Sequence, residues 1–254
     1  MGQIISLVNQ KGGVGKTTSS VNLASALALK KYKTLVIDAD SQGNASRALN
    51  ASKKHPFLYS VLLDSVPIQK AIQKTELENL FLIASNNNLA AFNIEGPKKK
   101  GWEFCLKENI QTLVTEFDFI FIDCPPCLGP LTVNVLTASQ KFIVPLQCEY
   151  YALEGLSQLV ETICRIRTHF NPQLQFQGIL LTMFDSRNSL SHQIEVEVRK
   201  RFEDKVFQTI VPRNVRLSEA PSFGQTIFQY DPKSLGAKSY VALSTEFEKV
   251  AGLN

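Results

Sequence analysis

Lysine, glycine and threonine residues gather in one short segment near the start of the chain, Asn9–Thr18. Glycines let a backbone curl tightly, so that several N–H groups converge on phosphate oxygens. Lys16 can neutralise the charge of β- and γ-phosphates, and the hydroxyl of Thr17 suits a Mg²⁺ ligand. The segment therefore predicts a site for nucleotide phosphates. The residues expected to form it are Lys11, Gly12, Gly13, Val14, Gly15, Lys16, Thr17 and Thr18.

The neighbours of this segment are those that a phosphate-binding loop requires. The apolar stretch Ile4–Val8 precedes it and a helix-like stretch, Thr17–Leu29, follows. The N-terminus of that helix would add a favourable dipole. Gln10 stands where the G-x-x-x-x-G-K-S/T pattern has its first glycine, and a second lysine, Lys11, comes next. The alternative is a glycine-rich turn with two incidental surface lysines, which the strand–loop–helix order disfavours.

Carboxylates end two further apolar stretches. Asp38 and Asp40 follow Leu35–Ile37, and Asp123 follows Phe119–Ile122. The carboxyl ends of parallel strands face the ligand crevice, so we expect the three carboxylates to converge near the phosphates. Asp123 has the form of a Walker B carboxylate, which would hold Mg²⁺ through water. The alternative is that these residues only cap strand ends, and it is stronger for Asp38.

Short apolar stretches alternate with helix-like stretches along the whole chain. This order predicts an α/β fold, with a mostly parallel sheet flanked by helices on both faces. We expect a single P-loop NTPase domain over residues 1–254, without an N-terminal helix-turn-helix extension, because the first strand begins by residue 4. The expected strands are 4–8, 35–37, 80–84, 119–122, 142–145, 179–182 and 206–210. The expected helices are 17–29, 102–115, 153–170, 190–202 and about 235–250.

The composition is that of a soluble globular protein, with 44% hydrophobic and 20% charged residues, which excludes disordered and fibrous chains. No apolar run approaches the ~20 residues that span a bilayer, and no secretory leader opens the chain. Five cysteines, an odd number, fit a reducing cytoplasm. The net charge of +4 permits DNA binding without arguing for it.

Four segments, Lys11–Thr18, Asp38–Asn44, Ile122–Pro126 and Val211–Pro221, form a joint pattern. They resemble the ParA/Soj family of chromosome- and plasmid-partitioning ATPases, in the deviant-Walker P-loop class that also holds MinD. The resemblance runs from residue 2 to about residue 245, and its last segment is the most specific. A fifth segment, Gln147–Gly155, is similar to the Soj branch.

The resemblance implies a cycle driven by ATP and Mg²⁺. ATP binding would drive a homodimer in which Lys11 reaches across to the partner's nucleotide. The dimer would bind double-stranded DNA nonspecifically, and a ParB-type partner would stimulate hydrolysis and release. The implied location is the cytoplasm, in association with the nucleoid.

The resemblance also implies roles for single residues. Asp40 matches the residue that positions the attacking water, and Ser41 departs from the family because proline is usual there. The implied catalytic residues are Lys11, Lys16 and Asp40, and the implied metal site is Thr17, Asp40 and Asp123. The region around adenine is matched by Pro212 and Asn214, and the DNA-binding arginines by Arg187 and Arg216.

Two alternatives concern partners. A MinD-like membrane ATPase would need a basic amphipathic C-terminal helix, whereas residues 239–254 carry two glutamates and one lysine. We therefore expect a docked helix and no stable membrane association. For Arg187 and Arg216, the alternative to DNA binding is that they are surface arginines paired with acids such as Asp185 and Glu219.

A C-x-x-C pair, Cys124 and Cys127, follows the Walker B carboxylate. A zinc or iron–sulfur site usually needs four ligands, and the other cysteines are isolated in the sequence. Cys127 stands where the resembled family usually has serine. We expect structural thiols here and no metal.

Overall fold

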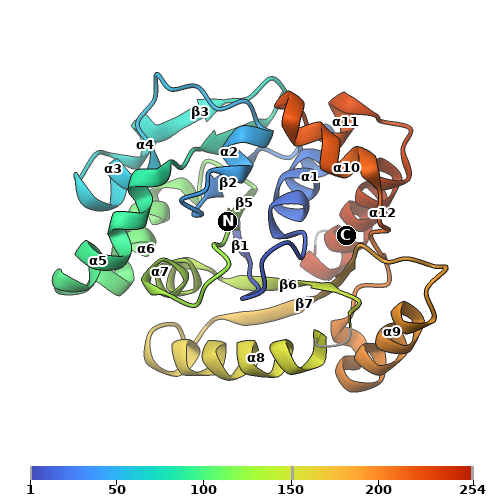
Figure 1. The fold of residues 1–254 in the computed structure, drawn as a ribbon. Helices are drawn as coiled ribbons and strands as arrows, with labels where there is room; N and C mark the ends of the chain where they lie inside the picture. Colours follow the sequence, from blue (N-terminus) through green and yellow to red (C-terminus); the bar gives the residue numbers. More distant parts are fainter. Residues whose placement is uncertain (1, 150–151, 253–254) are drawn as a thin grey trace.

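A seven-stranded sheet runs through the computed structural model, which describes residues 2–149 and 152–252. The strand order is β3-β4-β2-β5-β1-β6-β7, and every neighbouring pair is parallel except β3 and β4. The predicted α/β fold is confirmed (Figure 1). The strands are β1 (Gln3–Leu7), β2 (Thr34–Asp38), β3 (Ile72–Lys74), β4 (Leu80–Ile83), β5 (Phe119–Asp123), β6 (Lys141–Gln147) and β7 (Gln175–Thr182).

Helices cover both faces of the sheet (Figure 1). The α-helices are α1 (Lys16–Leu29), α2 (Asn44–Ala48), α3 (Leu58–Leu63), α4 (Ile68–Ala71), α5 (Phe92–Glu95), α6 (Cys105–Ile110), α7 (Pro130–Ala138), α8 (Ala152–His169), α9 (Ser189–Phe202), α10 (Val215–Glu219), α11 (Ile227–Tyr230) and α12 (Leu235–Ala251). The 3₁₀ turns are η1 (Asn87–Ala91), η2 (Gly96–Lys98), η3 (Trp102–Phe104), η4 (Gln111–Leu113), η5 (Glu203–Lys205) and η6 (Ala220–Phe223).

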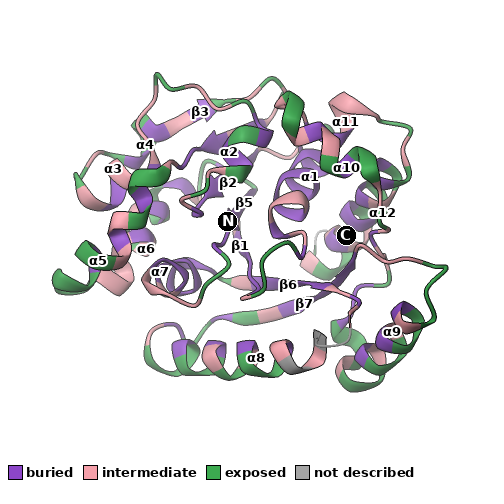
Figure 2. Cartoon of the chain, in the orientation of Figure 1, coloured by how far each residue is buried: buried purple, intermediate pink, exposed green. Residues whose placement is uncertain are grey.

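The strands are continuously apolar because both faces of the sheet are buried. In β1, Ile4 contributes to one core and its neighbour Ile5 to the other. The first core packs against α6, α7, α8 and α9, and the second against α1, α2 and α12. Phe247 of α12 lies with its ring centroid 5.5 Å from that of Phe119 in β5. The central strands and most of α1 are coloured as buried in Figure 2.

The expected strand 206–210 is wrong. The N–H groups of Phe207 and Val211 donate to facing carbonyls of β7, at 2.9 Å each. In a regular parallel ladder the donor between them, Thr209, would bond to β7 as well. Its N–H instead donates to the carboxylate of Glu246 in α12, at 2.8 Å. The segment therefore runs beside β7 without forming a strand.

Other differences lie in short elements. Strand β3 and helix α7 were not predicted from the sequence, and the expected helix 102–115 is reduced to α6 between two 3₁₀ turns. Within the described part of the chain, no helix has both the length and the apolar character that crossing a bilayer requires.

Candidate functional site

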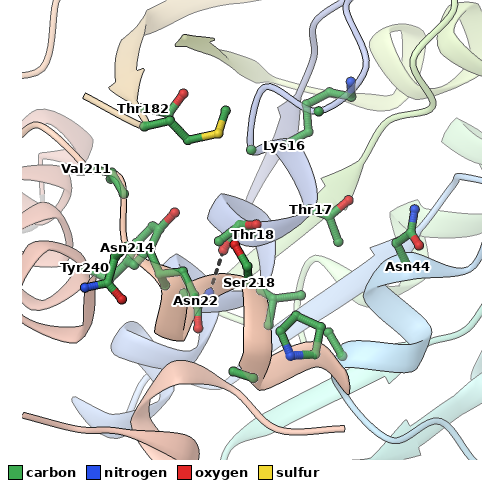
Figure 3. A pocket seen from close by; sticks show the side chains of 18 of the residues that line it. Lys16, Thr17, Thr18, Asn22, Asn44, Thr182, Val211, Asn214, Ser218 and Tyr240 are labelled. Carbon is green, nitrogen blue, oxygen red and sulfur yellow. Dashed lines mark hydrogen bonds between the residues drawn. The ribbon is translucent and has the colours of Figure 1, made fainter. Parts of the chain in front are cut away.

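A pocket of about 580 Å³ lies at the carboxyl edge of the sheet. The loop 12–18 forms one wall, and residues 211–221 form the wall that faces it. In Figure 3, Thr17 and Asn44 lie on one side of the pocket, and Asn214 and Tyr240 lie on the other. Residues of every expected ATP-binding segment therefore meet here. The expected ATP-binding residues that line the pocket are Gly12, Gly13, Gly15, Lys16, Thr17, Thr18, Pro212 and Asn214.

The loop's curvature comes from two glycines with left-handed backbones, Gly13 (φ +74°) and Gly15 (φ +87°). Residues other than glycine rarely adopt this backbone conformation, because their Cβ atom is crowded there. Val14 between them is buried, and its carbonyl accepts a hydrogen bond from the Thr182 hydroxyl at 2.8 Å. Gln10 does not need to be glycine, because its side chain points to α8, where its amide donates to the Gly155 carbonyl at 3.1 Å.

Lys16 is the first residue of α1 and is only 7% exposed. Its ammonium group donates to the carbonyl of Lys11 at 3.0 Å, within the loop. Burial lowers the pKa of Lys16, and the nearby carboxylate of Asp123 opposes this effect. A desolvated ammonium at a helix N-terminus is well placed to bind an anionic ligand.

Asp123 ends β5 and is fully buried. Its carboxylate accepts hydrogen bonds from the hydroxyls of Thr17 at 2.7 Å and Ser20 at 3.2 Å. Burial raises the pKa of Asp123, and the charge of Asp38 raises it further. A hydroxyl and a carboxylate in contact are oxygen ligands of the kind that Mg²⁺ prefers.

The three carboxylates lie close together, with Asp38 and Asp123 side by side on β2 and β5 and Asp38 accepting the N–H of Asp40 at 3.1 Å. Asp40 lines the pocket, and its Oδ1 accepts the N–H of Gln42 at 3.0 Å. Asp38 also accepts the N–H and the hydroxyl of Ser46, at 2.7 and 2.6 Å, and neither it nor Asp123 lines the pocket. Asp38 ties β2 to α2, which is the cap role that the sequence left open.

The wall opposite the phosphate loop carries Pro212 and Asn214. The side-chain oxygen of Asn214 is buried and has no hydrogen-bond partner among the described residues. Such an acceptor is costly unless a ligand satisfies it. Two further residues of this region were missed by the sequence analysis. Asn22 donates to the Thr18 carbonyl at 2.8 Å (Figure 3). The hydroxyl of Tyr240 contacts that of Ser19 at 3.0 Å.

No motif signals these missed residues, because both lie within ordinary helical patterns. The place of Tyr240 arises from packing of α12 on α1, and Asn22 accepts the N–H of Ile227 at the start of α11, at 2.9 Å.

Lys11 does not line the pocket of its own chain. Its ammonium group forms an ion pair with Glu149, and both side chains are about half exposed. Tyr150 and Tyr151, which belong to the segment similar to the Soj branch, lie outside the described residues.

The two expected DNA-binding arginines lie close together, Arg187 in the loop between β7 and α9 and Arg216 in the short helix α10. Backbone pairing of Phe184 with Pro212 joins the two segments, and Arg187 and Arg216 follow within four residues of that contact. Both arginines are exposed, by 87% and 54% of their side chains. Each forms an ion pair with nearby acids: Arg187 with Asp185, and Arg216 with Glu219 and Asp231.

The C-x-x-C pair is split by its environment. Cys124 is buried and Cys127 is exposed. Among residues 2–149 and 152–252, no cluster of three histidine, cysteine or acidic side chains could hold a metal ion.

Comparison with known proteins names the family. A family model described as an AAA domain matches residues 2–176. The chromosome partitioning protein ParA of Myxococcus xanthus is 49% identical over 251 residues, which cover 98% of this chain and 89% of the relative. The sporulation initiation inhibitor protein Soj of Bacillus subtilis is 48% identical, covering 97% of this chain and 98% of the relative. This chain belongs to the ParA/Soj family of partitioning ATPases.

Membership of the ParA/Soj family agrees with the resemblance predicted from the four sequence segments. A crystal structure of cobyrinic acid a,c-diamide synthase from Mycobacterium smegmatis, with bound ADP and magnesium, is also similar. Its TM-score is 0.86 at 32% identity, covering 100% of this chain and 97% of that chain. The fold is thus shared with a protein named for another activity, so the ParA/Soj assignment rests on the closer sequence relatives.

Proposed function

We propose that this chain is a Mg²⁺-dependent ATPase whose ATP-bound homodimer binds DNA nonspecifically during DNA partitioning. The observation that carries the proposal is one pocket with a phosphate loop at one side and an unsatisfied amide oxygen at the other. A ParB-type partner protein would end each cycle by stimulating hydrolysis. Family membership supports the partitioning role.

The residues present fit ATP and Mg²⁺. Lys16 and the loop N–H groups would bind the β- and γ-phosphates, and Thr17 with Asp123 would hold the metal ion, Asp123 through water. Bound Mg²⁺ neutralises charge on the phosphates. The free oxygen of Asn214 would accept a hydrogen bond from the 6-amino group of adenine, where guanine carries a carbonyl oxygen instead. This predicts a preference for ATP over GTP.

Asp40 is placed to act on water. It lies at the pocket wall on the loop after β2, with one oxygen held by the Gln42 N–H. The other oxygen has no hydrogen bond among the described residues. We infer that it orients the attacking water, which the loose transition state of phosphoryl transfer requires more than it requires a strong base.

The dimer would use Lys11. Its ion pair with Glu149 is exposed, and exposed pairs contribute only about 0–1 kcal/mol. Lys11 can therefore leave Glu149 at little cost and bind a phosphate of the partner's nucleotide. Bringing a second lysine to the triphosphate would link dimer formation to ATP.

The DNA surface would use Arg187 and Arg216. Their ion pairs are exposed as well, so a DNA phosphate can replace the carboxylates. The segments that carry them meet beside residues 211–221, the wall of the pocket opposite the phosphate loop, which we call the base-side wall. Dimerisation would thus place four arginines, two from each subunit, near one face.

The membrane alternative has little support from α12. Its buried residues, including Tyr240, Leu243 and Phe247, pack in the core beneath α1 and β5. A helix that lies on a membrane needs its apolar face free. We therefore infer no stable membrane association.

The test is hydrolysis of ATP by the purified protein with Mg²⁺, with and without DNA. We expect turnover that EDTA abolishes and that Lys16→Ala lacks. GTP should be hydrolysed more slowly at equal concentration, because it cannot satisfy Asn214. Turnover in EDTA, or equal turnover by Lys16→Ala, would refute the proposed site.

A further inference from the structure

The base-side wall of the pocket is carried by a segment without regular strand pairing, residues 206–214. It contacts β7 through the N–H groups of Phe207 and Val211, and the loop after β7 through the N–H of Arg213, which donates to Phe184 at 3.0 Å. Phe207 and Val211 are four positions apart, whereas donors to Ile179 and Leu181 in a regular parallel ladder would be two positions apart. Something other than the sheet must therefore hold the intervening turn.

Two side chains from other helices hold that turn. Glu246 of α12 accepts the N–H of Gln208 through Oε1 at 2.6 Å and the N–H of Thr209 through Oε2 at 2.8 Å. Arg199 of α9 donates to the carbonyl of Phe207 at 3.2 Å. A carboxylate that accepts two successive N–H groups fixes both the position and the orientation of the backbone.

The same helix also contacts the phosphate side of the pocket. Tyr240 lines the pocket, and its hydroxyl contacts that of Ser19, three residues after Lys16 in α1. Glu248 pairs with Lys30, near the far end of α1, at 2.6 Å. Helix α12 thus connects the helix that begins at the phosphate loop with the segment that leads to Asn214.

We propose that Glu246 is a positioning residue for the nucleotide base. By fixing the Gln208–Thr209 turn, its carboxylate sets the distance of Pro212 and Asn214 from the phosphate loop together with the hydrogen bonds of Val211 and Arg213 to β7 and Phe184. Nothing else among the described residues accepts these two N–H groups. The inference rests on the proposed ATP site and adds a determinant of base affinity and selectivity that lies outside the pocket.

The test compares Glu246→Gln with Glu248→Gln, the same change two residues along α12. In Glu246→Gln an amide NH₂ faces a backbone N–H, so one of the two hydrogen bonds is lost. In Glu248→Gln the turn is untouched, and the contacts of Glu248 with Lys30 and Tyr32 are weakened instead. Calorimetric titration measures the binding of ATP, GTP and inorganic tripolyphosphate, and thermal unfolding of the ligand-free proteins measures stability.

We expect Glu246→Gln to weaken ATP binding about tenfold, the effect of one hydrogen bond to a charged group. The ratio of ATP to GTP affinity should fall with it. Tripolyphosphate, which meets only the phosphate loop, should bind within about twofold of wild type. Glu248→Gln should keep wild-type values for all three ligands at a similar melting temperature.

An unchanged ATP affinity and ATP-to-GTP ratio in Glu246→Gln would overturn the inference. So would an equal loss of tripolyphosphate binding, because that would indicate general loosening of the protein. Wild-type protein that binds no ATP would overturn the proposed function, and the inference with it. Wild-type binding with an unaltered variant would overturn the inference alone.

Discussion

Lys16 is the residue on which the phosphate site depends most. It is nearly buried, and among the residues that the structure describes its ammonium group donates only to the Lys11 carbonyl of the same loop. Replacing it removes charge-assisted hydrogen bonds to phosphate, while the desolvation cost of burying the ammonium disappears as well.

We therefore expect Lys16→Ala to weaken ATP binding by about a hundredfold or more without unfolding the protein. Calorimetric titration and a thermal melt of the ligand-free variant measure both effects. Lys31→Ala, at an exposed lysine paired with Glu78, is the control and should bind ATP normally. ATP affinity of Lys16→Ala near the wild-type value would contradict the role of Lys16.

Asp123 gives a pH-dependent prediction. Because burial raises its pKa in the folded state, the folded protein holds a proton that the unfolded chain releases near pH 4. The stabilising effect of that proton is complete at low pH and is lost as pH rises through the folded-state pKa. The free energy of unfolding of ligand-free protein should therefore fall between pH 5 and pH 8.

Asp123→Asn removes this contribution. Between pH 5 and pH 8 the variant should therefore lose about 1–3 kcal/mol less free energy of unfolding than the wild-type protein does. Urea unfolding at the two pH values, without Mg²⁺ or nucleotide, measures the difference. Asp204→Asn, at an exposed carboxylate, should behave like wild type. Equal pH dependence in wild type and Asp123→Asn would show that Asp123 is not the group responsible.

At the scale of elements, the sequence predicted what is continuous and local. The buried strands, α1, α8, α9 and α12 follow from apolar runs and helical periodicity. The predicted strand 206–210 does not form, because Glu246, a residue about forty positions away, takes the N–H of Thr209 that a ladder with β7 would need. Tyr240 was missed for the same reason, since its place in the pocket depends on the packing of α12 against α1. The sequence left open whether Asp38 serves the site or caps a strand end, because its partner Ser46 is fixed only by the folding of α2 against β2.

The curvature of the phosphate loop depends on Gly13, which gives a prediction for stability. Gly13 has a left-handed backbone, and a Cβ added there would meet nothing within 4 Å. The effect of Gly13→Ala is therefore conformational, with an expected loss of about 1–2 kcal/mol in the free energy of unfolding. ATP binding should weaken too, because the loop N–H groups would change direction.

Gly12→Ala is the matched control for stability. Gly12 has no left-handed backbone, and a Cβ there would lie 3.9 Å from the Cβ of Pro126, an ordinary contact. Urea unfolding should show Gly12→Ala close to wild type and Gly13→Ala below it. Equal stability of the two variants would show that the loop tolerates alanine at Gly13 by relaxing.

At the scale of the whole molecule, two substitutions should separate dimerisation from hydrolysis. Lys11→Ala should bind ATP and stay monomeric, because it cannot reach the partner's nucleotide. Asp40→Ala should bind ATP and accumulate as a dimer without turnover. Light scattering with ATP, beside a phosphate-release assay, measures both; a normal dimer of Lys11→Ala or full activity of Asp40→Ala would contradict the respective role.

The charge of the molecule explains why DNA binding should depend on the dimer. A net charge of +4 gives one subunit few contacts with a polyanion. Each phosphate contact steepens the salt dependence of binding by ~0.9 in log K against log salt, and pairing two subunits doubles the contacts on one duplex. Arg216→Glu should remove most DNA binding and leave ATP-dependent dimerisation intact.

The most direct measurement is fluorescence anisotropy of a labelled random-sequence DNA duplex, titrated with wild-type protein in ATP, ADP or no nucleotide at several salt concentrations. We predict binding only with ATP, equal for unrelated sequences and steeply weakened by salt. Equally tight binding with ADP or without nucleotide would contradict the account of an ATP-gated DNA-partitioning ATPase, as would no binding in any of the three.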